Sequence, residues 1–249
     1  MQAVTLVVVS PLRCVVREAN RVLLTRKFVD GMALYRELWN GPLTLVCEKS
    51  DQASDNLDNV EVELDRAPFR IVTLNIQEES LRDALAPRSL VLSAVQFAWC
   101  SRLTQAAGVP CVYVSEYTLQ TRLQIVGESR SGFLRKVRQS WFERRAEAAQ
   151  RKALSLAQGV QCNGIPTYDA YRTLTPMPLL FFDTRIEESQ LAKPEQVRER
   201  CARFARDRKL RLVFSGRLNR MKGAQDLPII AAELKKRGVP FEFSICGDG

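Results

Sequence analysis

The chain alternates between short apolar runs and longer segments in which apolar residues recur at helical spacing. The runs are mostly β-branched and aliphatic, which is typical of strands buried on both faces of a parallel sheet. The predicted strands are Val4–Val9, Leu43–Cys47, Leu90–Ala94, Cys111–Val114, Gly159–Cys162, Leu179–Phe182, Leu210–Phe214 and Phe241–Cys246.

Predicted helices occupy the segments between many of these runs. They are Lys27–Trp39, Gln77–Leu85, Phe97–Ala107 and Gly132–Ala157. Strands that alternate with helices indicate βαβ units, in which helices cover both faces of a parallel sheet. The pattern therefore predicts an α/β fold.

The alternation breaks near Asp183. Residues 184–209 are highly charged, and Pro194 to Arg206 is predicted to form a polar helix. Composition shifts of this kind mark connections between domains, so we place one here.

A single β-α-β unit follows this connection and runs from Leu210 to Gly249. Two parallel strands and one helix cannot cover both faces of a sheet or build a core of their own. We therefore expect the second domain to be incomplete and the sequence to be part of a longer chain. The predicted division is residues 1–190 for the first domain, 191–209 for a linker helix and 210–249 for the start of the second domain.

The amino-acid composition limits the classes of protein to which this chain can belong. With 249 residues and 46% hydrophobic residues, the chain can bury a substantial core. The net charge of +9 suits nucleic acid, an anionic membrane or a phosphate-bearing substrate. The sequence has no histidine, which excludes Ser-His and Cys-His nucleophile arrangements. The run Val4–Val9 is too short for a signal core or a membrane span.

The seven cysteines are scattered along the chain, and none belongs to a C-x-x-C pair. Neither a disulfide framework nor a structural zinc site is expected, and no metal or cofactor is predicted. Free thiols in apolar runs behave as small hydrophobic residues, which fits a reducing cytoplasm.

The most specific motif follows the predicted strand Leu210–Phe214. Its sequence is Ser215-Gly216-Arg217-Leu218-Asn219-Arg220-Met221-Lys222-Gly223. Apolar residues then repeat at i, i+3, i+4 and i+7 from Leu227, which predicts an amphipathic helix that Asp226 could cap. The strand after this helix ends in Gly247-Asp248-Gly249.

The order of these elements indicates a phosphate site, because ligands of open parallel sheets bind beyond the carboxyl ends of the strands. Gly216 would let backbone approach a ligand closely, and Gly223 closes the loop. Arg217 offers a planar fork to phosphate oxygens, and Lys222 offers a mobile charge. The start of the helix adds N–H groups. The alternative is a loop of solvated cations with glycines that only make turns.

Residues 210–249, with the G-R-L, K-G and G-D-G elements in this order, resemble the nucleotide-sugar-binding domain of the retaining glycosyltransferases known as group 1 or family 4. The resemblance implies a GT-B fold, in which two Rossmann-like domains face each other across a cleft. It also implies that Arg217 and Lys222 hold the donor diphosphate. Relatives carry a glutamate pair further downstream, beyond the last residue of this sequence, so catalysis by this polypeptide alone is in doubt.

The first domain would then be the acceptor side, and its candidate residues follow predicted strands. Glu116 is a candidate for contact with the acceptor or for proton handling. The other acceptor-side candidates are Arg13, Tyr117, Arg122 and Asn163. For each of them the alternative is a structural role, as a capping residue or a solvated surface residue. Relatives often have a glycine pair after the first strand, where this chain has Ser10-Pro11-Leu12-Arg13.

The stretch from Ser129 to Gln158 is strongly basic and carries bulky apolar residues among its cations. The apolar residues are Phe133, Leu134, Val137, Trp141 and Phe142, and the cations are Arg130, Arg135, Lys136, Arg138, Arg144, Arg145, Arg151 and Lys152. Such a helix fits contact with an anionic membrane surface. An ordinary helix with its apolar side on the sheet and its arginines in water is the alternative.

The leading functional prediction is a retaining, metal-independent glycosyltransferase. It would move a sugar from a nucleotide diphosphate sugar to a glycan or lipid-linked acceptor in cell-surface polysaccharide synthesis, in the cytoplasm or at the inner face of the membrane. The alternative is a truncated, non-catalytic remnant or a membrane-associated interaction protein. A nucleic-acid partner is not expected, because no zinc finger or ribonucleoprotein motif is present. A dinucleotide-dependent dehydrogenase fits poorly, because no G-x-G-x-x-G follows an early strand.

Overall fold

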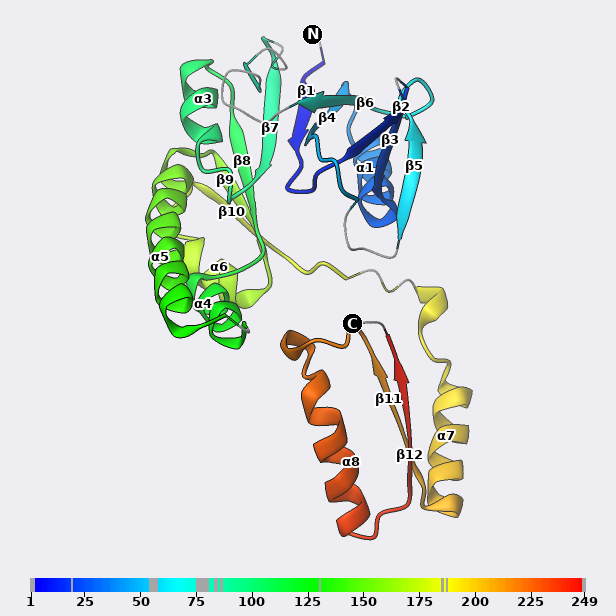
Figure 1. The fold of residues 1–249 in the computed structure, drawn as a ribbon. Coiled ribbons are helices and arrows are strands. Elements are labelled where there is room, and N and C mark those ends of the chain that lie inside the picture. Colours follow the sequence, from blue (N-terminus) through cyan, green and yellow to red (C-terminus); the bar gives the residue numbers. More distant parts are fainter. Residues whose placement is uncertain are drawn as a thin grey trace. The chain divides into compact units, whose positions relative to one another are not determined.

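The computed structural model describes residues 3–18, 20–53, 58–74, 81, 82, 85, 87–129, 131–184, 186 and 188–247. The chain divides into two compact units (Figure 1). Unit 1 comprises Met1–Leu123 and Val137–Asp183, and unit 2 comprises Gln124–Lys136 and Thr184–Gly249.

Unit 1 is built on a seven-stranded sheet with the order β10-β9-β8-β7-β1-β4-β6. Every neighbouring pair in this sheet is parallel. This confirms the predicted α/β class with a parallel sheet. The strands are β1 (Thr5–Val9), β4 (Leu43–Glu48), β6 (Arg70–Leu74), β7 (Ser89–Ala94), β8 (Cys111–Ser115), β9 (Gly159–Asn163) and β10 (Met177–Phe181).

Both faces of this sheet are packed, which explains why its strands are continuously apolar. Side chains alternate between the two faces of a strand. In β1, Val7 and Val9 belong to one core cluster, and Leu6 and Val8 belong to a second. Burying both sets of side chains requires helices on each face.

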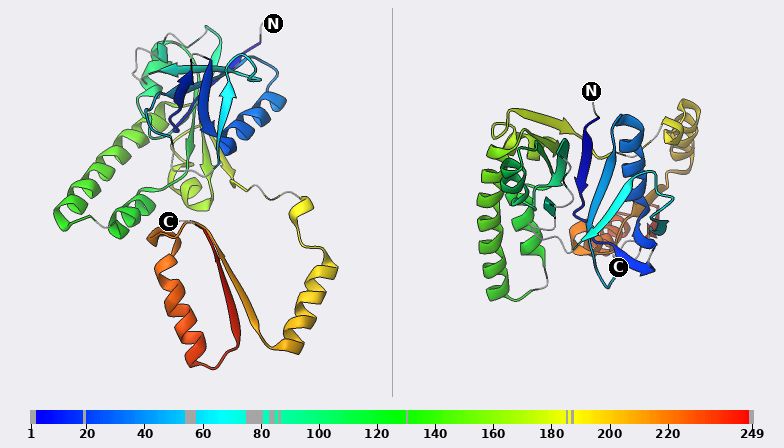
Figure 2. Two further views of the ribbon diagram at one scale, coloured as in Figure 1. Left: turned by 45° about the vertical axis from the view of Figure 1, so that its right-hand side comes forward. Right: turned by 90° about the horizontal axis from the view of Figure 1, so that it is seen from above.

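Those helices lie on opposite faces of the sheet. Leu154 of α5 (Phe133–Leu156) packs in the first core cluster, whereas Met32 of α1 (Arg26–Leu38) packs in the second. Figure 2 shows these two helices on either side of the strands. The remaining helices are α3 (Cys100–Ala106), α4 (Leu119–Glu128) and α6 (Ile165–Tyr171). The helix predicted at residues 77–85 falls mostly outside the described residues.

A second, antiparallel sheet in unit 1 was not predicted. Its order is β2-β3-β5, formed by β2 (Val15–Glu18), β3 (Arg21–Thr25) and β5 (Asn59–Glu63). β2 and β5 are short and carry charged residues, so they lack the continuous apolar run that marks a strand buried on both faces. The hairpin of β2 and β3 is inserted between β1 and α1.

Unit 2 contains a two-stranded parallel sheet of β11 (Leu210–Ser215) and β12 (Phe241–Cys246). The connection between them holds two short 3-10 helices, η2 (Arg220–Lys222) and η3 (Ala224–Asp226), and then α8 (Leu227–Lys236). Before β11 come η1 (Glu188–Gln190) and α7 (Pro194–Asp207). The predicted cap by Asp226 is wrong, because its side chain makes no capping hydrogen bond to α8.

No helix in the described part of the chain is long and apolar enough to span a membrane.

Candidate functional site

The carboxyl edge of the large sheet collects most of the residues predicted for unit 1. β1 pairs with β4 on one side and with β7 on the other, and the chain order reverses direction at this point. Open α/β sheets bind ligands at such a reversal, outside the carboxyl ends of the strands. The edge is therefore the place where a ligand of unit 1 is expected.

Arg13 lies at this edge but is paired with a neighbour. Its Nε lies 2.8 Å from Oε2 of Glu48, the last residue of β4. Ser10, the first residue after β1, is buried, and its Oγ accepts a hydrogen bond from the N–H of Leu12 at 2.9 Å. The loop after β1 is thus held by a serine turn, and its arginine is held by a carboxylate.

Glu116 and Asn163 are brought together by the sheet. Ser115 of β8 pairs with Cys162 of β9, so the next residues, Glu116 and Asn163, lie side by side at the carboxyl ends of the two strands. Glu116 is exposed. It does not cap α4, because the Oγ1 of Thr118 accepts the hydrogen bond from the N–H of Thr121 at 3.2 Å. Contact of Glu116 or of the exposed Tyr117 with an acceptor stays a prediction.

Asn163 belongs to a polar group that sequence reasoning missed. Its Oδ1 accepts a hydrogen bond from the backbone N–H of Asp183 at 3.1 Å. The carboxylate of Asp183 in turn lies 2.9 Å from Nζ of Lys27, in the first turn of α1. A carboxylate directly after a predicted strand was the available signal for Asp183. Nothing in the sequence links it to a lysine 156 residues away.

Arg122 is held within unit 1 by two glutamates of α5. Its guanidinium hydrogen-bonds to Glu147, and Nη1 lies 3.5 Å from the carboxylate of Glu143. The side chains of Arg122 and Glu147 are only 15% and 11% exposed. The hydroxyl of Tyr171 also donates to Glu147 at 3.0 Å. These contacts give Arg122 a structural role in joining α4 to α5, and acceptor contact stays a prediction.

Burial and the adjacent Glu147 carboxylate raise the pKa of Tyr171. The phenol is therefore kept protonated, and it serves as the hydrogen-bond donor that a buried carboxylate needs. The cluster of Arg122, Glu147 and Tyr171 is consequently suited to holding helices together rather than to transferring protons.

The loop from Ser215 to Asp226 of unit 2 carries the predicted phosphate-binding residues. Arg217 and Lys222 are both exposed. Gly223 ends η2 with a φ of 76°, a left-handed conformation that side chains other than glycine rarely adopt. The structure thus places both cations on one loop between the carboxyl end of β11 and the start of α8.

Asn219 orders this loop, although it was not among the predicted site residues. Its Oδ1 accepts a hydrogen bond from the N–H of Lys222 at 3.1 Å, and its carbonyl oxygen accepts one from Ala224 at 3.2 Å. Its own N–H donates to the carbonyl oxygen of Arg217 at 2.9 Å. The backbone that presents the two cations is therefore fixed by one asparagine. In the sequence, the position of Asn219 between Arg217 and Lys222 was the one indication of this role.

Glycines also bring the ends of the two strands of unit 2 close together. The N–H of Gly216 donates to the carbonyl oxygen of Cys246 at 3.0 Å. The next residue, Gly247, passes so near that a Cβ atom there would overlap the carbonyl group of Gly216. The two glycines therefore let the backbone segments that follow β11 and β12 pack directly against each other next to Arg217.

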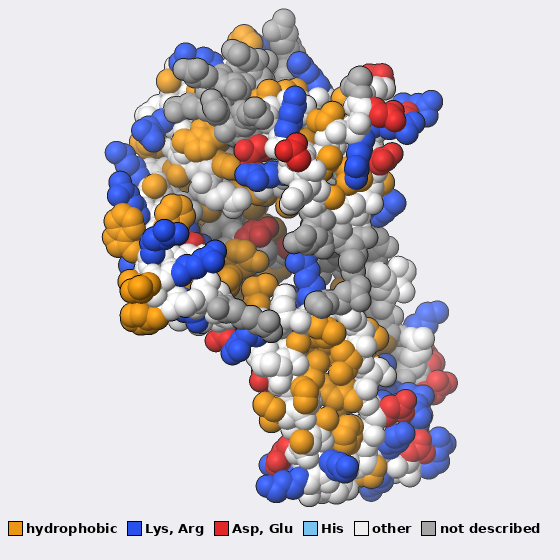
Figure 3. Space-filling model, in the orientation of Figure 1, with side chains coloured by type: hydrophobic (Ala, Val, Ile, Leu, Met, Phe, Trp, Pro, Cys, Tyr) orange, Lys and Arg blue, Asp and Glu red, His pale blue; other side chains and the backbone are white. Residues whose placement is uncertain are grey.

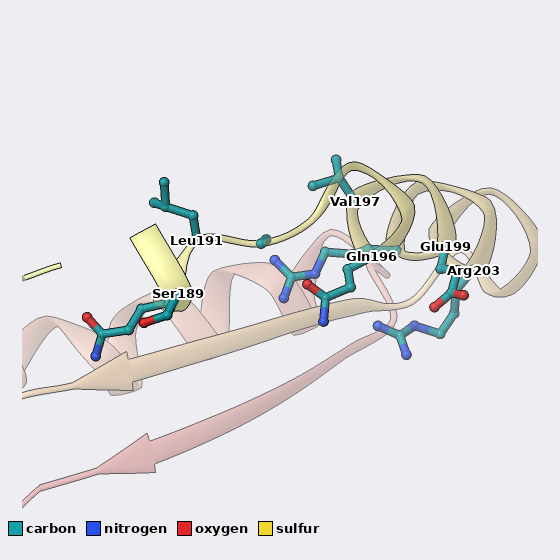
Figure 4. Close-up of a pocket in the computed structure, with 9 residues that line it drawn as sticks. Ser189, Leu191, Gln196, Val197, Glu199 and Arg203 are labelled. Atoms are coloured by element: carbon teal, nitrogen blue, oxygen red, sulfur yellow. The ribbon is translucent and has the colours of Figure 1, made fainter. Parts of the chain in front are cut away.

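Two hollows in the described part of the chain lie away from these residues. A groove of about 420 Å³ in unit 2 is lined by residues between Ser189 and Arg203, from η1 to α7, and includes neither predicted cation (Figure 4). In unit 1 a hollow of about 570 Å³ includes Leu43 and Arg70, the first residues of β4 and β6. It therefore lies at the edge opposite the carboxyl ends.

Among the residues that the structure describes, no group of three or more Cys, Asp or Glu side chains could hold a metal ion.

Comparisons with known proteins relate the chain to others through structure alone. No family model and no curated protein matches the sequence. Among solved structures, apo UGT2 of Phytolacca americana matches with a TM-score of 0.50 and 14% identity, over 96% of this chain and 63% of that one. UGT71G1 of Medicago truncatula complexed with UDP-glucose matches with a TM-score of 0.49 and 9% identity, over 98% of this chain and 67% of that one.

The chain thus spans about 63% of the length of the UGT2 structure. At 14% identity such a likeness establishes the fold and not the chemistry. The chain is an α/β protein with a Rossmann-like parallel sheet and a partial GT-B-like match.

Proposed function

We propose that this polypeptide belongs to a glycosyltransferase that uses a nucleotide diphosphate sugar as donor. The observation that carries the proposal is the loop after β11. Arg217 and Lys222 lie there between the carboxyl end of a parallel strand and the start of α8. This is the position at which α/β proteins bind phosphate groups. A GT-B-like fold is the setting in which such a loop serves a sugar donor.

The chemistry assigned to the loop is stabilisation of the leaving group. When the glycosidic bond to the donor breaks, negative charge grows on the departing nucleotide diphosphate. Arg217 would bind two phosphate oxygens with its planar fork, and Lys222 would add a point charge. Gly216 and Gly223 let the backbone come close to the ligand. A retaining mechanism without a metal is part of the proposal.

Unit 1 would bind the acceptor, a glycan or a lipid-linked sugar. Glu116 and Asn163 support this assignment, because they leave neighbouring strands side by side at the carboxyl edge. Glu116 is exposed there and is available to a sugar hydroxyl. Arg13 and Tyr117 are further acceptor-side candidates. Synthesis of a cell-surface polysaccharide is the process that we propose for such an enzyme.

The proposal is tested by incubating the protein with a panel of nucleotide diphosphate sugars and candidate glycan acceptors. Release of nucleotide diphosphate and formation of a glycosylated product are measured. Turnover with at least one donor, lost in an Arg217→Ala variant, is expected. Neither product nor donor hydrolysis across the panel would contradict catalysis by this polypeptide. Donor binding without turnover would instead support the non-catalytic alternative.

A further inference from the structure

The first half of α5 carries bulky apolar side chains that face solvent. Their exposed fractions are 78% for Phe133, 81% for Leu134, 52% for Val137, 59% for Trp141 and 62% for Phe142. A surface helix of a globular domain normally turns such residues toward the core. The alternative expectation, in which the apolar side packs on the sheet, is wrong for this half of the helix.

The polarity of α5 is in fact inverted in this region. Its side toward the domain holds Glu143 and Glu147, which pair with Arg122. Leu134 is nine residues from Glu143, which places it about 180° around the helix axis. Trp141 is two residues from Glu143, or about 160° around the axis. The carboxylates therefore point inward, and the apolar side chains form a stripe on the outer side.

Cations surround this apolar stripe. From Phe133 to Arg145 the helix has five Lys and Arg residues against one Glu, a net charge of +4. One of the five, Lys136, is turned toward α4, where its Nζ hydrogen-bonds to the carbonyl oxygen of Gly127, so the outer cations are arginines. That glutamate, Glu143, is engaged by Arg122 on the inner side. The guanidinium of Arg145 lies 5.5 Å from the ring centroid of Trp141. Figure 3 shows hydrophobic side chains beside Lys and Arg side chains over α4 and α5. The outer side thus combines large apolar groups with positive charge.

We propose that the outer side of α5 from Phe133 to Arg145 binds the surface of an anionic lipid bilayer. Leu134, Val137 and Trp141 enter the boundary between headgroups and acyl chains, and the cations contact lipid phosphates. Two features select a bilayer over a nucleic acid. Phosphate backbones attract cations but do not take up a stripe of aliphatic and aromatic side chains. A bilayer takes up both, and each Lys or Arg near its anionic surface adds to binding.

This surface is independent of the proposed donor loop, so it is tested without nucleotide sugars. The whole protein is mixed with vesicles of phosphatidylcholine that contain about 30% phosphatidylglycerol, and bound protein is measured by co-sedimentation. Tryptophan emission is recorded in parallel. We expect binding at low salt and a shift of the emission to shorter wavelength. A Trp141→Phe variant should lose this shift, because Trp141 is the tryptophan in the stripe.

Matched variants separate insertion from charge attraction. A Leu134→Gln, Trp141→Gln variant should bind these vesicles at least about 10-fold more weakly, because burial of apolar groups drives insertion. Its control is Leu38→Gln, Met177→Gln, at residues 74% and 72% exposed on α1 and β10, which should bind normally. An Arg138→Gln, Arg145→Gln variant should also lose about 10-fold or more. Its control, Arg200→Gln, Arg203→Gln on α7, should not.

The outcomes that overturn the proposal are specific. Suppose that the Leu134→Gln, Trp141→Gln variant binds vesicles fully and that only the Arg138→Gln, Arg145→Gln variant loses binding. The helix would then be attracted to any polyanion by charge alone, without insertion into the bilayer. Equal losses in the control variants, or no binding to anionic vesicles at all, would also overturn it. Circular dichroism spectra like that of the unsubstituted protein confirm that each variant is folded and that a loss arises at the surface.

Discussion

A Cβ atom placed on Gly247 would lie 1.9 Å from the carbonyl oxygen of Gly216. Two backbone segments, one after each strand of unit 2, therefore touch directly at the carboxyl end of the sheet. Gly247 also has a φ of 153°. The hydrogen bond from the N–H of Gly216 to the carbonyl oxygen of Cys246 holds the start of the Arg217 loop next to the end of β12, and the lack of a side chain at Gly247 leaves room for this contact.

A Gly247→Ala substitution should therefore destabilise unit 2. The added methyl group has to displace backbone, which costs about 1–3 kcal/mol. Hydrogen exchange at the amides of β11 and β12 measures the effect within this unit. Ser244→Ala, at an exposed residue of the same strand, is the control and should leave exchange unchanged. Equal exchange in both variants would show that the two segments do not pack in this way.

Removing the charge of Glu147 should destabilise unit 1. Glu147→Gln leaves the buried guanidinium of Arg122 with only the more distant Glu143, and breaking such a pair costs about 3 kcal/mol. Urea denaturation gives the change in the free energy of unfolding. Glu195→Gln removes a short but exposed ion pair with Arg198 and should change stability by less than about 1 kcal/mol. If both variants lose the same amount, Arg122 is not held as described.

Stability should also fall at alkaline pH. Burial raises the pKa of Tyr113 and of Tyr171 above the ordinary value of 10.0. As the pH rises above about 10, these phenols ionise in the unfolded chain before they ionise in the folded one. The unfolded state then binds fewer protons, so the free energy of unfolding decreases.

Urea denaturation between about pH 8 and pH 11 measures this slope. Tyr171→Phe should make this slope shallower, because one of the groups whose pKa is raised in the folded chain is removed. Tyr117→Phe alters an exposed side chain and should keep the slope of the unsubstituted protein. If Tyr171→Phe leaves the decrease of the free energy of unfolding with pH unchanged, ionisation of Tyr171 does not contribute to it.

Thiol reactivity should divide the cysteines into two groups. Cys201 and Cys246 are exposed, whereas the other five are buried. Burial raises the pKa of Cys111 to about 12 and that of Cys162 to about 11, which keeps these thiols in the unreactive protonated form. A colorimetric thiol reagent should therefore react quickly with two groups per chain, and with seven only in denaturant. Fast reaction of a third thiol in the folded protein would contradict the burial of the other five cysteines.

The sequence predicted those parts of the fold that depend on local pattern. β1 is a nearly continuous apolar run and β12 alternates apolar with polar residues, and the predicted bounds of both strands lie within a residue of the observed ones. β6 was missed because it is only partly buried and begins with a charged residue. The antiparallel β2, β3 and β5 were missed because β2 and β5 are short and charged, and because β3 pairs with β5 across a distant part of the sequence.

The candidate sites also divide into features that depend on local sequence pattern and features that depend on contacts between distant segments. Arg217 and Lys222 could be proposed from the sequence because a strand, a glycine loop and a helix come in sequence order, and their role in binding phosphate stays a prediction. The pairing of Arg122 with Glu147 depends on two helices meeting, and it gives a buried role to a residue predicted to face a ligand. The outward stripe of α5 could not be assigned either, because helical spacing does not say which side faces the sheet.

The central claim is that Arg217 and Lys222 bind the diphosphate of a sugar donor, and calorimetric titration of the protein with UDP tests it most directly. Single Arg217→Ala and Lys222→Ala variants should each weaken binding by about 10-fold or more, because each removes a charge-assisted contact to phosphate. Lys236→Ala, at the far end of α8, should bind UDP as the unsubstituted protein does. Equal UDP affinity in all of these proteins would contradict the account.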